Sequence, residues 1–256
     1  MHPLSAFDIV RVWELGQGKP SWYQALLMLA PAWPEASQQE LASLSLGYRN
    51  ALLFLLRKRL FGPKLQAGVK CPACAEVLEF ELLVDQLCDT QSQRLHEESH
   101  HLALEERLIR FRLPNTWDVA ALCGAIGGDF PPEVLAQRCI QSVSIKDTLN
   151  ASTHDADDEI DLKASLNEMD LQQVMEQIQE CDPQFETRLG LDCDACQHSW
   201  SAPFDMGTFL WVELSAHAQR LTEEAHVLAK NYGWSERDIL MMSTFRRTQY
   251  LELAVG

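Results

Sequence analysis

Apolar residues recur at helical spacing in the first quarter of the chain. Ser37 with Glu40 forms the capping-box pattern of a helix start. Within 36–61 the residues near helical spacing are Leu41, Leu44, Tyr48, Leu52, Leu55 and Leu56. Gly62-Pro63 supplies a stop. We therefore expect one long helix over 36–61.

The C-terminal third has a second long helical pattern. Residues 206–232 place an apolar stripe along one side, Asp205 precedes them as a candidate N-cap and Gly233 follows as a stop. Shorter helices are predicted at 116–122, 131–140, 163–180 and in SERDILMMS from Ser235, and the chain finishes with a short segment at 245–253. Helix is expected to dominate the fold.

Alternation of apolar and polar residues marks the short strands. Residues 67–83 contain CPAC followed by VLEFELL, and residues 186–205 contain CDAC between extended segments. Each stretch predicts a β-hairpin with a Cys-x-x-Cys turn at its tip. We call these two turns the first knuckle (Cys71 to Cys74) and the second knuckle (Cys193 to Cys196). The stretch HLALEERLIRFRLP also has extended character.

The two Cys-x-x-Cys turns supply a complete ligand set for one zinc ion. Each turn aims two thiolates at one metal, so Cys71, Cys74, Cys193 and Cys196 predict a tetrahedral Zn²⁺ site. Because all four ligands are cysteines, no position is left for water or substrate, and the single zinc is expected to be structural. Four unligated thiols are the main alternative. Thioredoxin-type redox chemistry is disfavoured because neither motif opens a helix.

The other four cysteines show no ligand spacing. Cys88, Cys123, Cys139 and Cys181 lie in or beside apolar segments, which predicts small buried hydrophobic side chains.

The formal charge of -16 is unevenly distributed. Residues 1–70 hold eight Lys and Arg against four Asp and Glu, a net +4, and the remaining residues are net -20. Such a balance disfavours general nucleic-acid binding, which depends on neutralising phosphates. The basic run at 57–59 is interpreted as cations near the C-terminal end of a helix.

The N-terminus has charged residues where a secretory signal needs an apolar run, and no later segment has the apolar length of a membrane span. A cytoplasmic location is therefore expected, with cysteines present as thiols or metal ligands.

One further motif has the form of a catalytic zinc site. His96, Glu97 and His100 match H-E-x-x-H, but polar residues precede them, and only Asp118 is available as a guess for a third ligand. A solvated loop or helix is the favoured interpretation, and a zinc hydrolase is the less favoured alternative.

We expect the chain to divide at an acidic segment. Residues 1–145 would form a helical region with the first knuckle, 146–162 an acidic linker or loop, and 163–256 the second knuckle and the C-terminal helices. The shared zinc would pack the two parts as one unit. The predicted fold class is a helix-rich α+β protein with two short β-hairpin zinc knuckles joined into one four-cysteine site, and a long C-terminal helix.

The order of these features resembles a known family. The run RKRLFGPKL, the knuckle CPAC, an extended segment ending FRLP, the knuckle in LDCDACQHSW, then PFDMGTFLWVEL and YGWSERDIL are similar to zinc-knuckle baseplate and baseplate-hub assembly proteins. Those proteins belong to T-even-like phages and to phage-derived contractile injection systems.

The resemblance implies a non-enzymatic protein that is either a structural baseplate component or a chaperone-like assembly factor. It also implies a structural zinc, and baseplate or tail-hub proteins as partners. It implies assembly in the bacterial cytoplasm, and leaves open whether the protein stays in the virion or injection particle. No nucleic acid and no membrane span is expected. The rival interpretation is a zinc-ribbon adaptor in nucleic-acid or transcription machinery.

Overall fold

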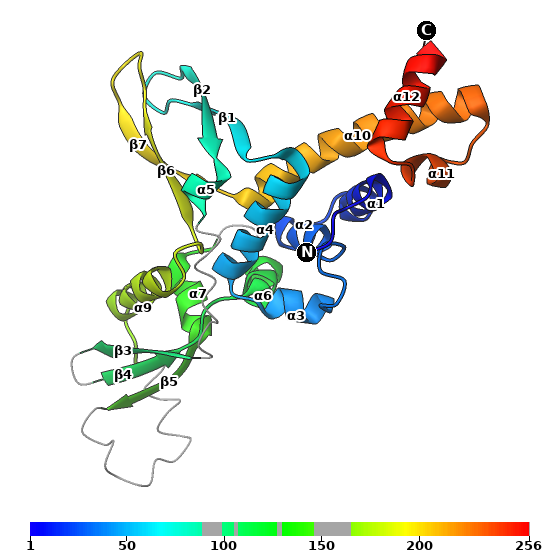
Figure 1. Cartoon of the computed structure of the whole chain (residues 1–256). Coiled ribbons are helices and arrows are strands. Elements are labelled where there is room, and N and C mark those ends of the chain that lie inside the picture. The colour runs from blue at the N-terminus through cyan, green and yellow to red at the C-terminus, as the bar shows by residue number, and fades with distance from the viewer. Residues whose placement is uncertain (89–98, 105–106, 127–129, 146–164, 256) are drawn as a thin grey trace.

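The computed structural model describes residues 1–88, 99–104, 107–126, 130–145 and 165–255 (Figure 1). Within these residues helices dominate, and the strands form two hairpins and one three-stranded antiparallel sheet of order β3-β4-β5. The helix-rich α+β class is confirmed. The helices are α1 (Ala6–Gly16), α2 (Ser21–Leu29), α3 (Gln38–Ser43), α4 (Leu46–Phe61), α5 (Val84–Leu87), α6 (Thr116–Ile126), α7 (Pro132–Cys139), α9 (Glu168–Cys181), α10 (Met206–Tyr232), α11 (Glu236–Leu240) and α12 (Thr244–Val255). The strands are β1 (Lys64–Lys70), β2 (Val77–Leu83), β3 (His100–Leu104), β4 (Arg107–Phe111), β5 (Ile140–Ile145), β6 (Thr187–Asp192) and β7 (Ser199–Phe204).

Helix α10 has the bounds predicted from the sequence. The Asp205 carboxylate accepts a hydrogen bond from the Gly207 N–H at 2.9 Å, and Gly233 ends the helix in the left-handed conformation at φ 68°. At about 1.5 Å per residue, its 27 residues span about 40 Å. The hairpins lie near its N-terminal end, and α11 and α12 lie at the other end (Figure 1).

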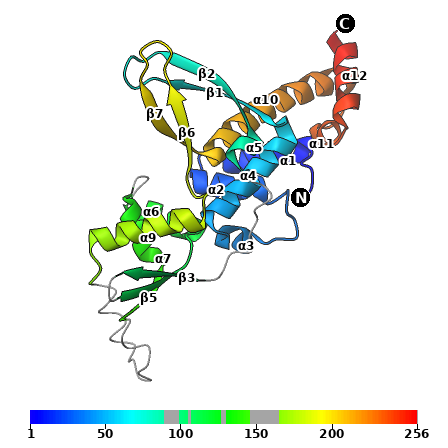
Figure 2. The ribbon, with the colours of Figure 1, turned by 60° about the vertical axis from the view of Figure 1, so that its left-hand side comes forward.

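The larger core forms where α10 packs against the N-terminal helices. Contacts join α10 to α1, α2 and α4, so the two ends of the chain share one apolar cluster (Figure 2). The sequence pattern made no assignment for α1 and α2. The largest fully buried residues of this apolar cluster include Leu26, Met28, Leu29, Leu53, Phe54, Leu56, Leu65, Met206 and Leu210.

The helix predicted over 36–61 is two helices, so its continuity was wrong. Ser37 and Glu40 form the expected capping box on α3, and α3 then ends because Leu44 is extended at ψ 145°. The side chain of Ser45 accepts a hydrogen bond from the Tyr48 N–H and starts α4. The local cap and a β-bridge from Ser45 to Asn115 outweigh the continuous helical pattern.

A second core lies under the three-stranded sheet. Helices α7 and α9 pack together, and strand β5, which the sequence pattern missed, pairs with β4. The buried residues of the second core are Leu46, Ile109, Phe111, Leu113, Leu122, Leu135, Ala136, Cys139, Ile140, Val143, Val174, Met175 and Ile178. The division at 146–162 stays a prediction, since residues 146–164 lie outside the described part.

The two cores meet at the N-terminal end of α4. The buried carboxylate of Asp182 accepts a hydrogen bond from the Gly47 N–H at 2.9 Å, across 135 residues of sequence. A Cβ on Gly47 would lie 1.8 Å from Asp182 Oδ1, so only glycine allows this approach. The Asn50 side chain adds a 3.1 Å hydrogen bond to the Gln184 carbonyl.

The buried carboxylate of Asp118 predicts acid sensitivity of the second core. Burial raises its pKa, but hydrogen bonds from Arg112, at 2.6 and 2.8 Å, and from the Asn115 N–H outweigh burial and hold the pKa below its ordinary value. An unfolded Asp titrates near pH 3.9. Asp118 therefore contributes its full stabilisation above about pH 4, and loses it as the pH falls through the lower folded-state pKa.

We expect Asp118→Asn to be less stable than wild type at about pH 6. The difference in free energy of unfolding between the two proteins, measured by denaturant unfolding, should be smaller at about pH 3. A deficit of the same size at both pH values would contradict this assignment.

Candidate metal centre

Each knuckle sits at the tip of a two-stranded antiparallel hairpin. In the first, Leu65 pairs with Leu82 and Ala67 with Phe80, so one face is apolar and its alternate residues are exposed. In the second hairpin, Leu189 opposite Ala202 and Leu191 opposite Trp200 repeat this arrangement. The hairpins lie side by side in both views (Figures 1 and 2). Both predicted hairpins are confirmed.

The backbone of the two knuckles has the same hydrogen-bond pattern. The Cys71 N–H donates to the Glu76 carbonyl at 2.8 Å, and the Ala75 N–H donates to the Cys71 carbonyl at 2.9 Å. In the second knuckle, the Cys193 N–H donates to His198 at 2.9 Å and the Gln197 N–H donates to Cys193 at 2.8 Å. Two segments more than 100 residues apart thus present their cysteines in the same way.

The four sulfur atoms converge on one point. The Sγ atoms of Cys71 and Cys196 lie 3.7 Å apart, those of Cys74 and Cys193 lie 3.6 Å apart, and all four lie within 4.8 Å of one another. Zinc–sulfur bonds of about 2.3 Å in a tetrahedron would place the sulfurs about 3.8 Å apart. The residues present therefore fit a single tetrahedral metal ion. The cysteines at the first position of each motif are buried and those at the second are exposed.

The thiols titrate unequally because they are crowded. Desolvation raises the pKa of Cys71, but hydrogen bonds from the Cys74 and Ala73 backbone and from the Cys196 thiol bring it to about 7. The Glu76 backbone lowers the pKa of Cys74, but the Cys196 and Cys193 thiols raise it to about 12. Four thiolates at these distances would repel one another, and a bound cation would offset that repulsion.

The residue that follows the second cysteine of each knuckle has a backbone conformation that restricts which side chains are tolerated there. Ala75 and Gln197 have positive φ, 62° and 57°, and are the described residues other than glycine with this conformation. The left-handed region costs an ordinary residue about 1 kcal/mol or more and is worst for β-branched side chains, whereas asparagine tolerates it.

Ala75→Val should therefore lower the free energy of unfolding by about 1–2 kcal/mol, while Ala75→Asn leaves it nearly unchanged, as measured by denaturant titration of metal-loaded protein. Equal stability of the two variants would show that the backbone of this turn is not constrained.

The hydrolase alternative falls partly outside the described residues, and within them His100 and Asp118 belong to no cluster of potential metal ligands. His96 and Glu97 lie outside those residues, and His100 begins strand β3 with its ring stacked on Phe111 at 5.5 Å. The H-E-x-x-H chemistry needs both histidines on one helical turn. Asp118, the guessed third ligand, is held by Arg112, and Arg138 lies 3.4 Å away.

The remaining cysteines are less uniform than expected. Cys88 and Cys139 are buried, as predicted. Cys123 and Cys181 are only half-buried, so that prediction was wrong for them. Cys181 packs at the edge of the second core.

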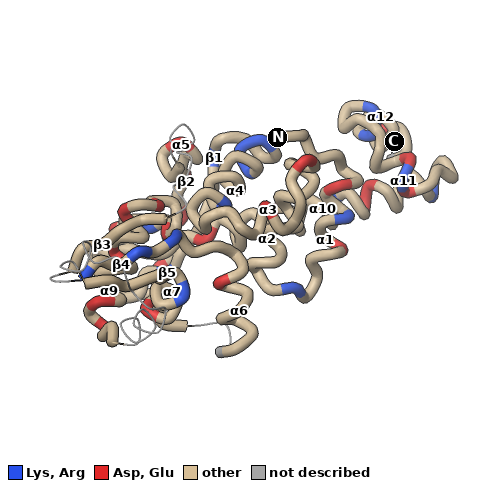
Figure 3. The backbone as a smooth tube through the Cα atoms, turned by 90° about the horizontal axis from the view of Figure 1, so that it is seen from below, with Lys and Arg blue, Asp and Glu red and all other residues tan. Residues whose placement is uncertain are grey.

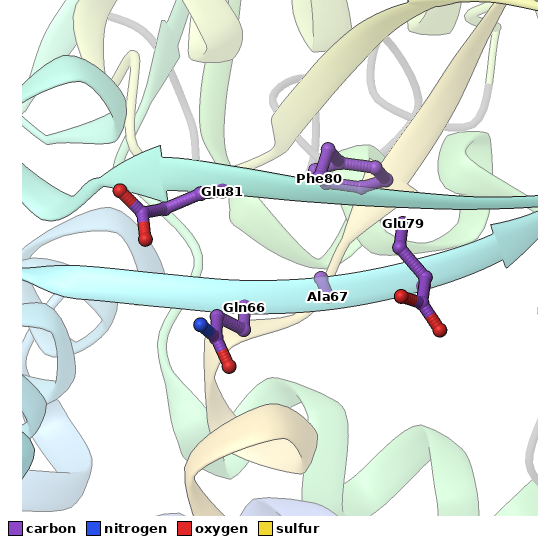
Figure 4. Close-up of a pocket in the computed structure, with 6 residues that line it drawn as sticks. Gln66, Ala67, Glu79, Phe80 and Glu81 are labelled. Atoms are coloured by element: carbon purple, nitrogen blue, oxygen red, sulfur yellow. The ribbon is translucent and has the colours of Figure 1, made fainter.

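A shallow hollow of about 500 Å³ lies on the first hairpin, lined by Gln66 to Gly68 and Glu79 to Glu81. Phe80 projects to the face opposite Gln66 and Glu79 (Figure 4). The Lys64 ammonium lies 2.7 Å from the Glu81 carboxylate. The hollow adds no ligand to the metal centre, because none of the four cysteines lines it.

One residue of the basic run has a role that the sequence did not reveal. Arg57 is buried, and its guanidinium donates to both carboxylate oxygens of Glu213, at 2.9 and 2.7 Å. It also donates to the carbonyls of Gly62 and Lys64. Arg57 thereby ties the base of the first hairpin to α10. Its neighbours Lys58 and Arg59 lie in the last turn of α4, as predicted.

Among the described residues, no helix combines the length and the apolar character that a membrane span needs.

No curated protein and no solved structure matches the chain. Residues 33–211, more than half of the sequence and both knuckles included, match the family described as T4 bacteriophage base plate protein. The resemblance seen in the sequence is confirmed, and the chain belongs to this family of phage baseplate proteins.

Proposed function

We propose that the protein is a non-enzymatic baseplate component that assists assembly of a contractile tail, and that a structural zinc ion bound by Cys71, Cys74, Cys193 and Cys196 fixes its shape. The observation that carries the proposal is the family match over 33–211, which spans both Cys-x-x-Cys turns. The all-cysteine ligand set supports a structural zinc. The partners would be other baseplate or tail-hub proteins.

The zinc would act by holding two distant segments together. The knuckles belong to hairpins separated by α6, α7, α9 and the second core, and they converge only in the folded chain. The first hairpin follows α4 and the second leads directly into α10, so the metal would fix both hairpins relative to the larger core. A rigid projecting pair of hairpins suits binding to a protein surface with little loss of entropy.

The proposal is tested by deleting the gene and complementing it. Without the protein we expect tails that lack complete baseplates, and pull-down of tagged protein should recover other baseplate subunits. A Cys71→Ser/Cys193→Ser variant should fail to restore particles, whereas Cys123→Ser, a cysteine outside the cluster, should restore them. Normal particles in the deletion strain would overturn the proposal.

A further inference from the structure

A small pocket lies at a junction of four helices, separate from the metal centre. Its volume is about 210 Å³, and its walls come from the N-terminal segment, α1, the end of α4, α10 and α12. The apolar part of the lining includes Leu4, Ile9, Leu60 and Phe61. The polar part includes Arg59, His217 and Arg247, and we call the whole feature the Arg59 pocket.

One cation of the Arg59 pocket has no counter-ion among the residues that the structure describes. Arg59 forms no hydrogen bond or ion pair with any residue in the described ranges, although it sits on an ordered helix turn. Arg247 is buried, and its Nε donates to Glu224 Oε2 at 2.7 Å, with a longer 3.4 Å contact from Nη1 to the Met242 carbonyl. Glu224 therefore offsets Arg247, whereas Arg59 is an exposed cation to which no described acidic side chain is paired.

The imidazole of His217 lines the same pocket and is half-buried. Burial lowers its pKa, Arg220 and Arg247 lower it further, and only Glu224 opposes them. The ring is therefore neutral at pH 7 and packs edge-on against Phe61 at 5.8 Å. Lys and Arg gather at the end of α4 and on α12 (Figure 3), although the whole chain carries a charge of -16.

We propose that the Arg59 pocket binds an acidic segment of a partner protein, taking one carboxylate against Arg59 and an adjacent apolar side chain against Phe61. The volume is below the roughly 300–1,000 Å³ of pockets that enclose drug-sized ligands, and suits one or two side chains. The choice of a polypeptide over a small anion rests on the proposed baseplate function.

The test is selection of a randomised heptapeptide library on the whole metal-loaded protein. We expect the selected peptides to combine Asp or Glu with an aromatic or aliphatic neighbour. Their affinity, measured by calorimetry, should fall about tenfold in Arg59→Gln, because a charge-assisted hydrogen bond is lost. Arg110→Gln removes the same charge from an exposed site on β4 and should leave the affinity within about twofold.

Four outcomes would overturn the proposal: no enrichment of peptides, enrichment of neutral peptides, equal effects of the two arginine variants, or displacement of the peptide by inorganic phosphate or duplex DNA at equal concentration. The last would indicate a phosphate site. Failure here, with particle assembly still dependent on the protein, would leave the baseplate function standing and remove only this pocket from it.

Discussion

A Cys71→Ser/Cys193→Ser double variant should unfold at a temperature about 10 °C below that of the wild type. The variant removes one ligand from each hairpin, and the sulfur pair of Cys74 and Cys193 alone closes a loop of 119 residues. A cross-link over a loop of about 100 residues stabilises a fold by roughly 4 kcal/mol, mainly by constraining the unfolded chain. Each kcal/mol corresponds to about 2–4 °C in a chain of this size.

The matched control is Cys123→Ser, which changes one half-buried thiol outside the cluster and should cost less than about 1 kcal/mol. Calorimetry of wild type with excess chelator should reproduce the unfolding temperature of the double variant, because both lose the metal. An unchanged melting temperature in the double variant would show that the cysteines do not clamp the hairpins.

Gly47→Ala should destabilise the protein by about 3 kcal/mol, the second largest effect we expect. The new Cβ would lie 1.8 Å from Asp182 Oδ1, so the carboxylate must withdraw and leave the Gly47 N–H unpaired in a buried position. Overpacking and a lost buried hydrogen bond each cost about 1–3 kcal/mol. The two cores should loosen at this junction, which hydrogen exchange of α4 and α9 would detect.

A double-mutant cycle isolates the steric cause. In an Asp182→Ala background the clash disappears, so Gly47→Ala should cost less than about 1 kcal/mol there. Gly124→Ala is the helical glycine control, since nothing lies within 4 Å of its Cβ position, and it should stabilise by about 0.5–1 kcal/mol. Equal costs of Gly47→Ala in both backgrounds would place the effect elsewhere.

The sequence was most informative where a local signal acts alone. The bounds of α10 followed from Asp205 and Gly233, because a cap and a left-handed stop need no tertiary partner. Likewise, the spacing of each knuckle specified its hairpin. Which cysteines would meet was also predictable, since two Cys-x-x-Cys turns complete one ligand set.

The sequence was least informative where distant segments decide the structure. The break between α3 and α4 depends on the bridge from Ser45 to Asn115, and strand β5 exists because it pairs with β4. No local sequence pattern predicts such pairings, because tertiary contacts form them and override the local helical propensity. The ion pair of Arg57 with Glu213 likewise joins residues 156 positions apart, so a basic run alone could not identify it.

The central claim, a four-cysteine zinc clamp in a baseplate protein, is tested most directly by elemental analysis combined with zinc K-edge X-ray absorption of the purified full chain. We expect one zinc per chain with four sulfur neighbours at about 2.3 Å. Protein purified without zinc, or zinc with nitrogen or oxygen neighbours in place of sulfur, would contradict the claim.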